Sequence, residues 1–291
     1  MDLFAGGCAI THCGMLSGKW SEFLVNDLNG KMPQMFLDAI EGKFANETRW
    51  ISREDFFALK DSDQCVSTCW SFGNNCMRYL YGRPIEPYKK AFHYAVVFDD
   101  WILLEQLCPE TWKVAKDALD GMPTSTWKER KVRRLKFKRT MVSEIKRQRI
   151  ERNIIHNPDL YKALRRMLQN LESLERLNGL EQKTHLPITA TSTSYEEYEF
   201  REGDVVYCDP PYQGTTAADY YTDGFDNNKF WEWVRTRDYP VYVSEYSAPE
   251  DFVSIWSKKK LRLAAGAKSG IKGNEATEHL FIHRRFKEEH K

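Results

Sequence analysis

Short apolar segments near both ends of the chain have the length and composition of buried strands. The first, residues 2–7, ends in the glycine pair Gly6-Gly7. The second, residues 22–27, ends on the carboxylate of Asp27. After residue 186 this pattern returns, and it predicts strands at 188–193, 204–208, 239–244 and 279–282. The chain is therefore expected to begin and end in a β-sheet.

Between these two ends, hydrophobic residues recur at helical spacing. The sequence predicts helices within 30–60, 99–119 and 127–152, and a further one after Asn157, with Pro158 at its first position. This last helix carries one apolar stripe and is expected to end near Gly179; the stripe consists of Leu160, Leu164, Met167, Leu171 and Leu174. We therefore expect an α/β fold in which residues 1–60 and 186–291 form a discontinuous catalytic domain around a helical insertion, 61–185.

Composition is compatible with this organisation. The 291 residues can bury a full-sized core, and a mean hydropathy of −0.62 with 29% charged residues is typical of a soluble globular protein. The longest apolar stretches, such as 95–98 and 101–104, are far too short to cross a bilayer, and no signal-peptide pattern is apparent. A cytoplasmic location in a bacterial cell is expected.

The near-neutral net charge of +1 conceals a strong asymmetry. Residues 113–166 contain 17 basic and six acidic residues, a net charge of +11, so the rest of the chain carries −10. Such a segment is either a polyanion-binding face or a solvated basic helix.

Seven scattered cysteines show no zinc-ribbon or redox spacing, and free thiols are the simplest interpretation. A metal site at Cys8, His12 and Cys13 is the minor alternative, and no metal is expected.

Two local motifs suggest the chemistry. The glycine pair Gly6-Gly7 lies 20 residues before Asp27, which is the spacing of a nucleotide-binding βαβ unit with a carboxylate for ribose hydroxyls. The second motif, Asp209-Pro210-Pro211-Tyr212, directly follows a predicted strand. A proline pair can simply end a strand, but ligands bind at the carboxyl edge of α/β sheets.

The second motif suits methylation of an amino group conjugated to a ring. The carboxylate of Asp209 and the carbonyl of Pro210 could accept the two amino N–H groups and free the nitrogen lone pair. Tyr212 could stack on the base, a contact worth about 1–3 kcal/mol in single-strand binders. A base in a duplex would have to be flipped out to reach such a pocket.

These residues resemble the Dam-like, D12-class adenine-N6 DNA methyltransferases, particularly their phage-borne members, which include restriction-modification enzymes. Further similar segments are Gly224-Phe225-Asp226, 230–233, 243–246 with Pro249, 70–75, Lys268-Ser269 and 278–281. The resemblance implies a Rossmann-like sheet that binds S-adenosyl-L-methionine and an inserted target-recognition region. It assigns to the cofactor the residues Asp2, Phe4, Ala5, Gly6, Gly7, Asp27 and Asp209. The chain starts within the first strand, so the segment that usually precedes the glycine loop in this family is expected to be absent.

The densest basic stretch, with Trp127 and Phe137 nearby, is the predicted DNA-facing surface. It consists of Lys128, Arg130, Lys131, Arg133, Arg134, Lys136, Lys138 and Arg139. The leading hypothesis is therefore methyl transfer to adenine N6 in double-stranded DNA. The alternatives are an inactive DNA-binding remnant and an amino methyltransferase that acts on cytosine N4 or on RNA.

Overall fold

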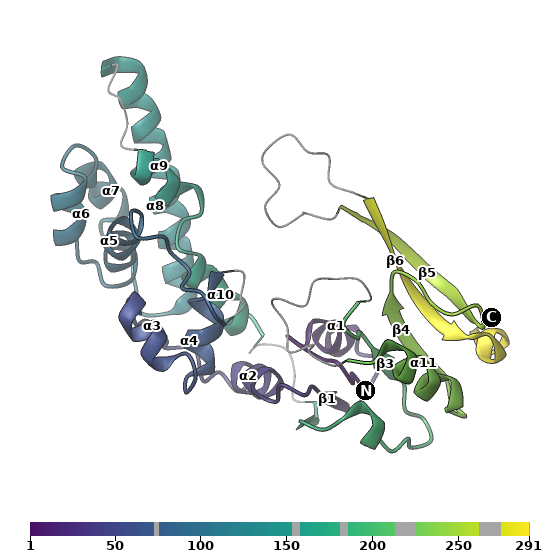
Figure 1. Cartoon of the computed structure of the whole chain (residues 1–291). Helices are drawn as coiled ribbons and strands as arrows, with labels where there is room; N and C mark the ends of the chain where they lie inside the picture. Colours follow the sequence, from purple (N-terminus) through teal and green to yellow (C-terminus); the bar gives the residue numbers. More distant parts are fainter. Residues whose placement is uncertain (73–75, 153–157, 181–185, 213–224, 262–274, 291) are drawn as a thin grey trace. The chain divides into compact units, whose positions relative to one another are not determined.

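The chain divides into two compact units. The computed structural model describes residues 1–72, 76–152, 158–180, 186–212, 225–261 and 275–290. The sheet unit joins Met1–Leu37 to Thr184–Lys291, and the helical unit is Asp38–Lys183 (Figure 1). The first boundary lies ahead of the expected residue 60, because Ile51 and Phe56 are buried in the core of the helical unit.

The sheet unit contains all the described strands, which makes the fold mixed α/β as predicted. They are β1 (Phe23–Asn26), β2 (Ile188–Thr191), β3 (Val206–Cys208), β4 (Val241–Glu245), β5 (Phe252–Leu261) and β6 (Glu275–His283). β1 pairs in parallel with β2, β3 pairs in parallel with β4, and β6 lies antiparallel between β4 and β5. In β5 only Phe252 is buried among the residues whose burial is described, and residues 254–259 are all exposed, so the strand lacks the alternation that would have predicted it.

Residues 1–5 connect the two groups of strands. The backbone N–H of Asp2 donates to the Leu24 carbonyl at 2.9 Å, and that of Leu3 donates to the Tyr207 carbonyl at 3.0 Å. The N-terminal segment therefore lies between β1 and β3 as a parallel neighbour of both. Counted from one edge, the order is β2, β1, residues 1–5, β3, β4, β6, β5.

In the described part of the chain, three α-helices belong to this unit or begin in it: α1 (Ala9–Ser17), α2 (Lys31–Ile40) and α11 (Asn227–Thr236). Asp226 caps α11 by accepting the backbone N–H groups of Asn228 and Lys229. Phe230, Trp231, Trp233 and Val234 of this helix pack into the same buried cluster as the β3 and β4 side chains. Helix α11 therefore packs against β3 and β4 and buries the side chains at the end of β3.

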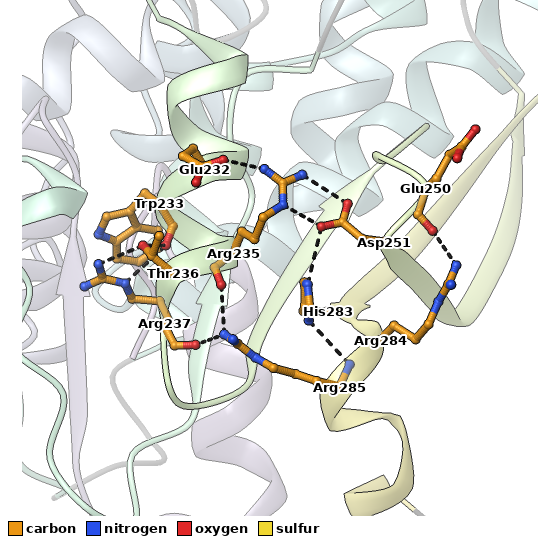
Figure 2. Close-up of polar contacts among 10 residues, drawn as sticks. All are labelled: Glu232, Trp233, Arg235, Thr236, Arg237, Glu250, Asp251, His283, Arg284 and Arg285. Carbon is orange, nitrogen blue, oxygen red and sulfur yellow. Dashed lines mark hydrogen bonds and ion pairs between the residues drawn. The ribbon is translucent and has the colours of Figure 1, made fainter.

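Charged side chains attach the far end of α11 to β5 and β6 (Figure 2). Arg235 donates to Asp251 from two nitrogens, at 2.5 and 3.0 Å, and His283 Nε2 lies 3.3 Å from the same carboxylate. The hydrogen bond from Arg235 lowers the pKa of Asp251 to about 2. Arg285 donates to the backbone carbonyls of Arg235 and Arg237, where the helix leaves its last carbonyls unpaired.

The helical unit is built from eight described helices besides the end of α2. They are α3 (Arg53–Leu59), α4 (Gln64–Cys69), α5 (Glu86–Val97), α6 (Ile102–Leu107), α7 (Trp112–Leu119), α8 (Trp127–Arg152), α9 (Pro158–Arg165) and α10 (Gln169–Asn178). The predicted apolar stripe is buried in the core of this unit. It lies on α9, α10 and the turn between them, which holds Met167, rather than on one helix, because Leu168 adopts φ 52° and interrupts the helical path.

In the parts of the chain that the structure describes, no helix combines the length and apolar character needed to cross a membrane. The seven cysteines are free, as expected. Among the described residues there is no cluster of His, Cys, Asp and Glu side chains that could hold a metal ion.

Candidate functional site

The two sequence motifs end at the same edge of the sheet. The Tyr207 backbone N–H donates to the Met1 carbonyl at 2.8 Å, and the Leu3 N–H donates to the Tyr207 carbonyl at 3.0 Å. Residues 1–5 and β3 run in parallel, so their carboxyl ends lie side by side. The glycine loop that follows the first and the Asp209–Tyr212 turn that follows the second are therefore neighbours.

Asp27 organises the glycine loop. Its Oδ2 accepts the backbone N–H of Gly6 at 2.8 Å, and its Oδ1 accepts that of Asn29 at 2.8 Å. Gly6 has φ +45°, which glycine adopts without steric cost. A Cβ built on Gly6 or Gly7 would meet no atom within 4 Å, so the outer side of the loop is open. Each carboxylate oxygen of Asp27 retains a lone pair for a further donor.

Asp2 lies inside the sheet unit rather than on the open side of the loop. It is 5% exposed, and its Oδ2 accepts the Thr11 hydroxyl of α1 at 2.9 Å. Its Oδ1 is buried without a partner among the described residues. Burial raises the pKa of Asp2, against the opposing effect of the Thr11 hydrogen bond. The carboxylate therefore fixes α1 beneath the loop.

Phe4 and Ala5 form the base of the loop. Ala5 is buried, and its N–H donates to the Asn26 carbonyl at 2.9 Å. The Phe4 ring packs against the rings of Tyr195, Phe225 and Phe230, with centroids 5.3–5.7 Å apart. These aromatic contacts fix the backbone just before the glycine pair.

The Asp209–Tyr212 turn presents different surfaces at successive positions. Asp209 is exposed, Pro210 is buried, and Pro211 and Tyr212 are half-buried. The Tyr212 hydroxyl lies 2.9 Å from Ser244 Oγ on β4 and donates to Glu278 Oε1 on β6 at 2.6 Å. Its ring meets Tyr246 edge to face, with centroids 4.7 Å apart. These contacts fix the tyrosine ring while the aspartate stays accessible to solvent.

Ser244 and Glu278 were not among the predicted site residues. Nothing in the local sequence marks them as partners of a tyrosine more than 30 residues away. The antiparallel pairing of β4 with β6 sets Ser244 opposite Leu280, and this register brings Glu278 to the tyrosine. Gln213 to Gly224 and Lys268-Ser269 lie outside the described residues.

Three of the eight predicted DNA-facing side chains are buried inside the helical unit, which corrects that part of the prediction. Arg133, at 1% exposure, donates to the carbonyls of Ala95, Val96, Leu119 and Met122 and to Asp99 Oδ1. Arg134 forms a bidentate pair with Glu175 and contacts Glu172, and Arg130 donates to the backbone carbonyls of Ala45, Thr124 and Ser125. Carbonyls at the ends of α5 and α7 have no intrahelical partner, and Arg133 satisfies such groups.

The remaining cations lie on the opposite side of α8. Lys128, Lys131, Lys136 and Arg139 are exposed, and Lys138 is half-buried. Lys128 and Arg139 fall within about 20° of one another around a helix of 3.6 residues per turn, flanked by Lys131 and Lys136. The solvent-facing side of α8 is therefore strongly cationic.

The family resemblance is confirmed by a comparison with known protein families. A model described as D12 class N6 adenine-specific DNA methyltransferase matches residues 138–241. The match includes part of α8, all of β3 and the Asp209–Tyr212 turn. Proteins of this family are enzymes, and their reaction is adenine methylation in DNA. No curated protein matches the chain.

Proposed function

We propose that this protein transfers a methyl group from S-adenosyl-L-methionine to N6 of adenine in double-stranded DNA. The single observation that carries the proposal is the adjacency of the glycine loop and the Asp209–Tyr212 turn at one sheet edge. A cofactor site and an amine-binding site must adjoin for direct methyl transfer. The family match over the turn supports the same reaction.

The strand order supports a Rossmann-like interpretation of the sheet. If residues 1–5 count as the first strand, the order across the sheet is 3-2-1-4-5-7-6. A doubly wound fold begins with the same 3-2-1-4-5, and its ligands bind where the order reverses, between strands 1 and 4. Here these are residues 1–5 and β3. The helical unit interrupts the chain between strands 2 and 3, which is the position of an inserted recognition region.

The residues at this edge fit the proposed cofactor. Asp27 has lone pairs left for the ribose hydroxyls, and the open side of Gly6 and Gly7 allows a ligand to approach the backbone closely. Phe4 and Ala5 support the loop, and the buried Asp2 holds α1 in place behind it. When bound, the cofactor supplies an electrophilic methyl group on a sulfonium.

The Asp209–Tyr212 turn would hold the amino group of adenine. The Asp209 carboxylate and the Pro210 carbonyl accept its two N–H groups, which releases the nitrogen lone pair from conjugation with the ring. Pro210 and Pro211 keep this backbone rigid. Tyr212, held through Ser244 and Glu278, offers its ring to a base that has left the duplex. Positioning and electrostatics are the main catalytic contributions in this scheme.

The exposed cations of α8 are proposed to contact DNA phosphates. Lys128, Lys131, Lys136 and Arg139 would provide affinity that depends on salt and not on sequence. We also propose that the protein acts in the cytoplasm of a bacterial cell.

The decisive experiment measures transfer of a labelled methyl group to duplex DNA and identifies the product by nucleoside mass spectrometry. We expect N6-methyladenine, and we expect Asp209→Ala to abolish it while Asp61→Ala, an exposed site on the helical unit, leaves it intact. N4-methylcytosine or methylated RNA would favour the alternative amino methyltransferases. DNA binding without cofactor binding in calorimetry would indicate the inactive remnant.

A further inference from the structure

The helical unit contains an open cavity of about 400 Å³ that the proposed methyl transfer does not use. This volume lies in the range of small-molecule sites. The cavity is formed between the start of α3, the segment before α5, α5 itself and the region from α9 to α10. Its lining residues are Arg53, Phe72, Tyr79, Leu80, Tyr81, Gly82, Arg83, Ile85, Lys89, Lys162, Arg166 and Gln169.

Two buried tyrosines form the rigid wall of the cavity. Tyr79 donates its hydroxyl to the Ile51 carbonyl at 2.8 Å, and Tyr81 donates to Asn170 Oδ1 at 2.6 Å. The Arg53 guanidinium lies 4.8 Å from the Tyr79 ring centroid, and the Lys89 ammonium lies 5.0 Å from that of Tyr81. Both hydroxyl groups donate their hydrogen bonds to other groups of the protein. The wall therefore offers a ligand in the cavity mainly the tyrosine rings and the neighbouring cations.

Every charged side chain in the lining is a cation. Five of the twelve lining residues are basic and none is acidic. Two of the five are neutralised nearby, since Arg53 pairs with Glu86 and Lys162 with Asp159, each at 3.3 Å. In the described part of the chain, no ion pair neutralises Arg83, Lys89 or Arg166.

Lys89 is the most unusual of these cations. It is 1% exposed, and its ammonium donates to the Arg166 backbone carbonyl. Burial lowers the pKa of Lys89 to about 7. The other charged groups that act on it are Glu172 on α10, which opposes this shift, and Lys138 on α8 and Arg166, which reinforce it. Burial thus favours the neutral form of Lys89, and an anion bound beside it would favour the charged form instead.

Arg53 provides an independent indication. Its Nε is buried and has no hydrogen-bond partner among the described residues, although its terminal nitrogen donates to the Tyr81 carbonyl. Buried polar groups in native proteins are nearly always satisfied, so an orphan N–H at a cavity wall points to a missing acceptor. Phe72, which is 53% exposed, also lines the cavity.

We propose that this cavity binds the phosphate group of a nucleotide, with Arg83, Lys89 and Arg166 as its ligands and the Phe72 ring against the base. Arginine and lysine donate charge-assisted hydrogen bonds to phosphate oxygens, and an exposed aromatic ring stacks on any base. The nucleotide is either free or part of a nucleic-acid strand. The cavity lies entirely within the helical unit and is distinct from the Asp209–Tyr212 turn.

Calorimetry on the full-length protein tests this with AMP, with adenosine, and with a single-stranded oligonucleotide. We expect AMP to bind and adenosine to bind at least about tenfold more weakly, because it lacks the phosphate. Arg83→Gln and Arg166→Gln should each weaken AMP binding by about tenfold or more. Both residues are exposed, so neither variant should affect folding; Lys113→Gln, an exposed site on α7, is the matched control.

The source of the phosphate and the role of Lys89 have separate readouts. If the oligonucleotide binds more tightly than AMP and loses this advantage in Arg166→Gln, the site binds a nucleic-acid strand. If AMP binds more tightly than the oligonucleotide and loses this advantage in Arg166→Gln, the site binds a free nucleotide. Affinity for a phosphodiester dinucleotide should fall between about pH 6 and pH 8 as Lys89 loses its proton, and Lys89→Met should abolish this dependence.

Two results would overturn the proposal. One is that no phosphate-containing probe binds. The other is that Arg83→Gln and Arg166→Gln bind every probe as Lys113→Gln does. These binding measurements require neither cofactor nor turnover, so a failure of the proposed methyl transfer would leave them interpretable.

Discussion

The Tyr212 hydroxyl donates a 2.6 Å hydrogen bond to Glu278 Oε1, which joins the turn after β3 to the last strand of the sheet. Burial raises the pKa of Tyr212, and the hydrogen bond to Glu278 adds to this effect. The tyrosine is therefore a neutral donor with a fixed ring. Its proposed stacking on adenine depends on a contact across 66 positions of the sequence.

The first prediction separates the ring of Tyr212 from its hydroxyl. Tyr212→Phe keeps the stacking surface and loses one donor, so we expect kcat/KM for methyl transfer to fall by about tenfold or less. Tyr212→Ala also loses stacking worth about 1–3 kcal/mol, so its loss should be about tenfold greater again. Glu278→Gln retains an acceptor for the Tyr212 hydroxyl and should therefore lose less activity than Tyr212→Phe. Equal activity of the Phe and Ala variants would argue against stacking.

The second prediction concerns Asp27 and the cofactor. Asp27→Asn removes the negative charge and replaces one of the two acceptor oxygens with an NH2 donor. Either the loop N–H groups or the ribose hydroxyls therefore lose an acceptor. We expect S-adenosyl-L-methionine to bind about tenfold or more weakly in calorimetry, since hydrogen bonds to charged groups are worth about 1.5–3 kcal/mol. Asp61→Asn, at an exposed position of the helical unit, serves as the charge-matched control. Unchanged affinity in Asp27→Asn would place the ribose elsewhere.

The third prediction contrasts two arginines of the same helix. Arg133 is buried with all of its N–H donors used inside the helical unit, whereas Arg139 is exposed. We expect Arg133→Ala to lower the free energy of unfolding by about 3–5 kcal/mol, because it leaves the carbonyls of Ala95, Val96, Leu119 and Met122 without this donor inside the helical unit.

Arg139→Ala should leave the unfolding free energy within about 0.5 kcal/mol of the wild type. It should instead weaken DNA binding and lower the slope of log affinity against log salt by about one. Denaturant unfolding and salt-dependent binding of a duplex measure the two effects. A salt slope that Arg139→Ala does not alter would remove this side chain from the DNA interface.

The fourth prediction concerns pH and His93. The Asn170 amide donates to Nδ1 at 3.2 Å and the Nε2–H donates to the Thr48 carbonyl at 2.9 Å, so the buried imidazole is neutral. Burial lowers the pKa of His93 to about 4, while in the unfolded chain it is about 6.5. Because the unfolded state binds this proton first, His93 should cost stability as the pH falls from about 6.5 to 4.

The loss should be on the order of 2 kcal/mol across this window. Denaturant unfolding at several pH values measures it, and His93→Gln is the comparison because it retains an amide donor and does not titrate. If the unfolding free energies of the wild type and His93→Gln fall in parallel as the pH is lowered, His93 is not the group responsible for the loss.

Local patterns predicted the elements that depend on local rules. Short apolar runs correctly predicted strands at β1 to β4 and at β6, and Pro158 was correctly expected at the first position of its helix. Leu168 shows the limit of such rules. The apolar spacing through Leu164, Met167 and Leu171 continues without interruption, yet the backbone at Leu168 turns left-handed and divides the helix.

The candidate site and the charge distribution also combine features that follow from local sequence with features that depend on packing. The sequence by itself determined the glycine loop with its carboxylate, the Asp209–Tyr212 turn and the basic stretch, because each is a short run of neighbouring residues. Only the tertiary structure decided that Glu278 holds Tyr212, that Arg133 supports helix ends instead of facing solvent, and that five cations converge on one cavity. These outcomes depend on strand register and on which unsatisfied carbonyls the packing brings within hydrogen-bond distance of a donor. Residues far apart in the chain carry no local signal of these contacts.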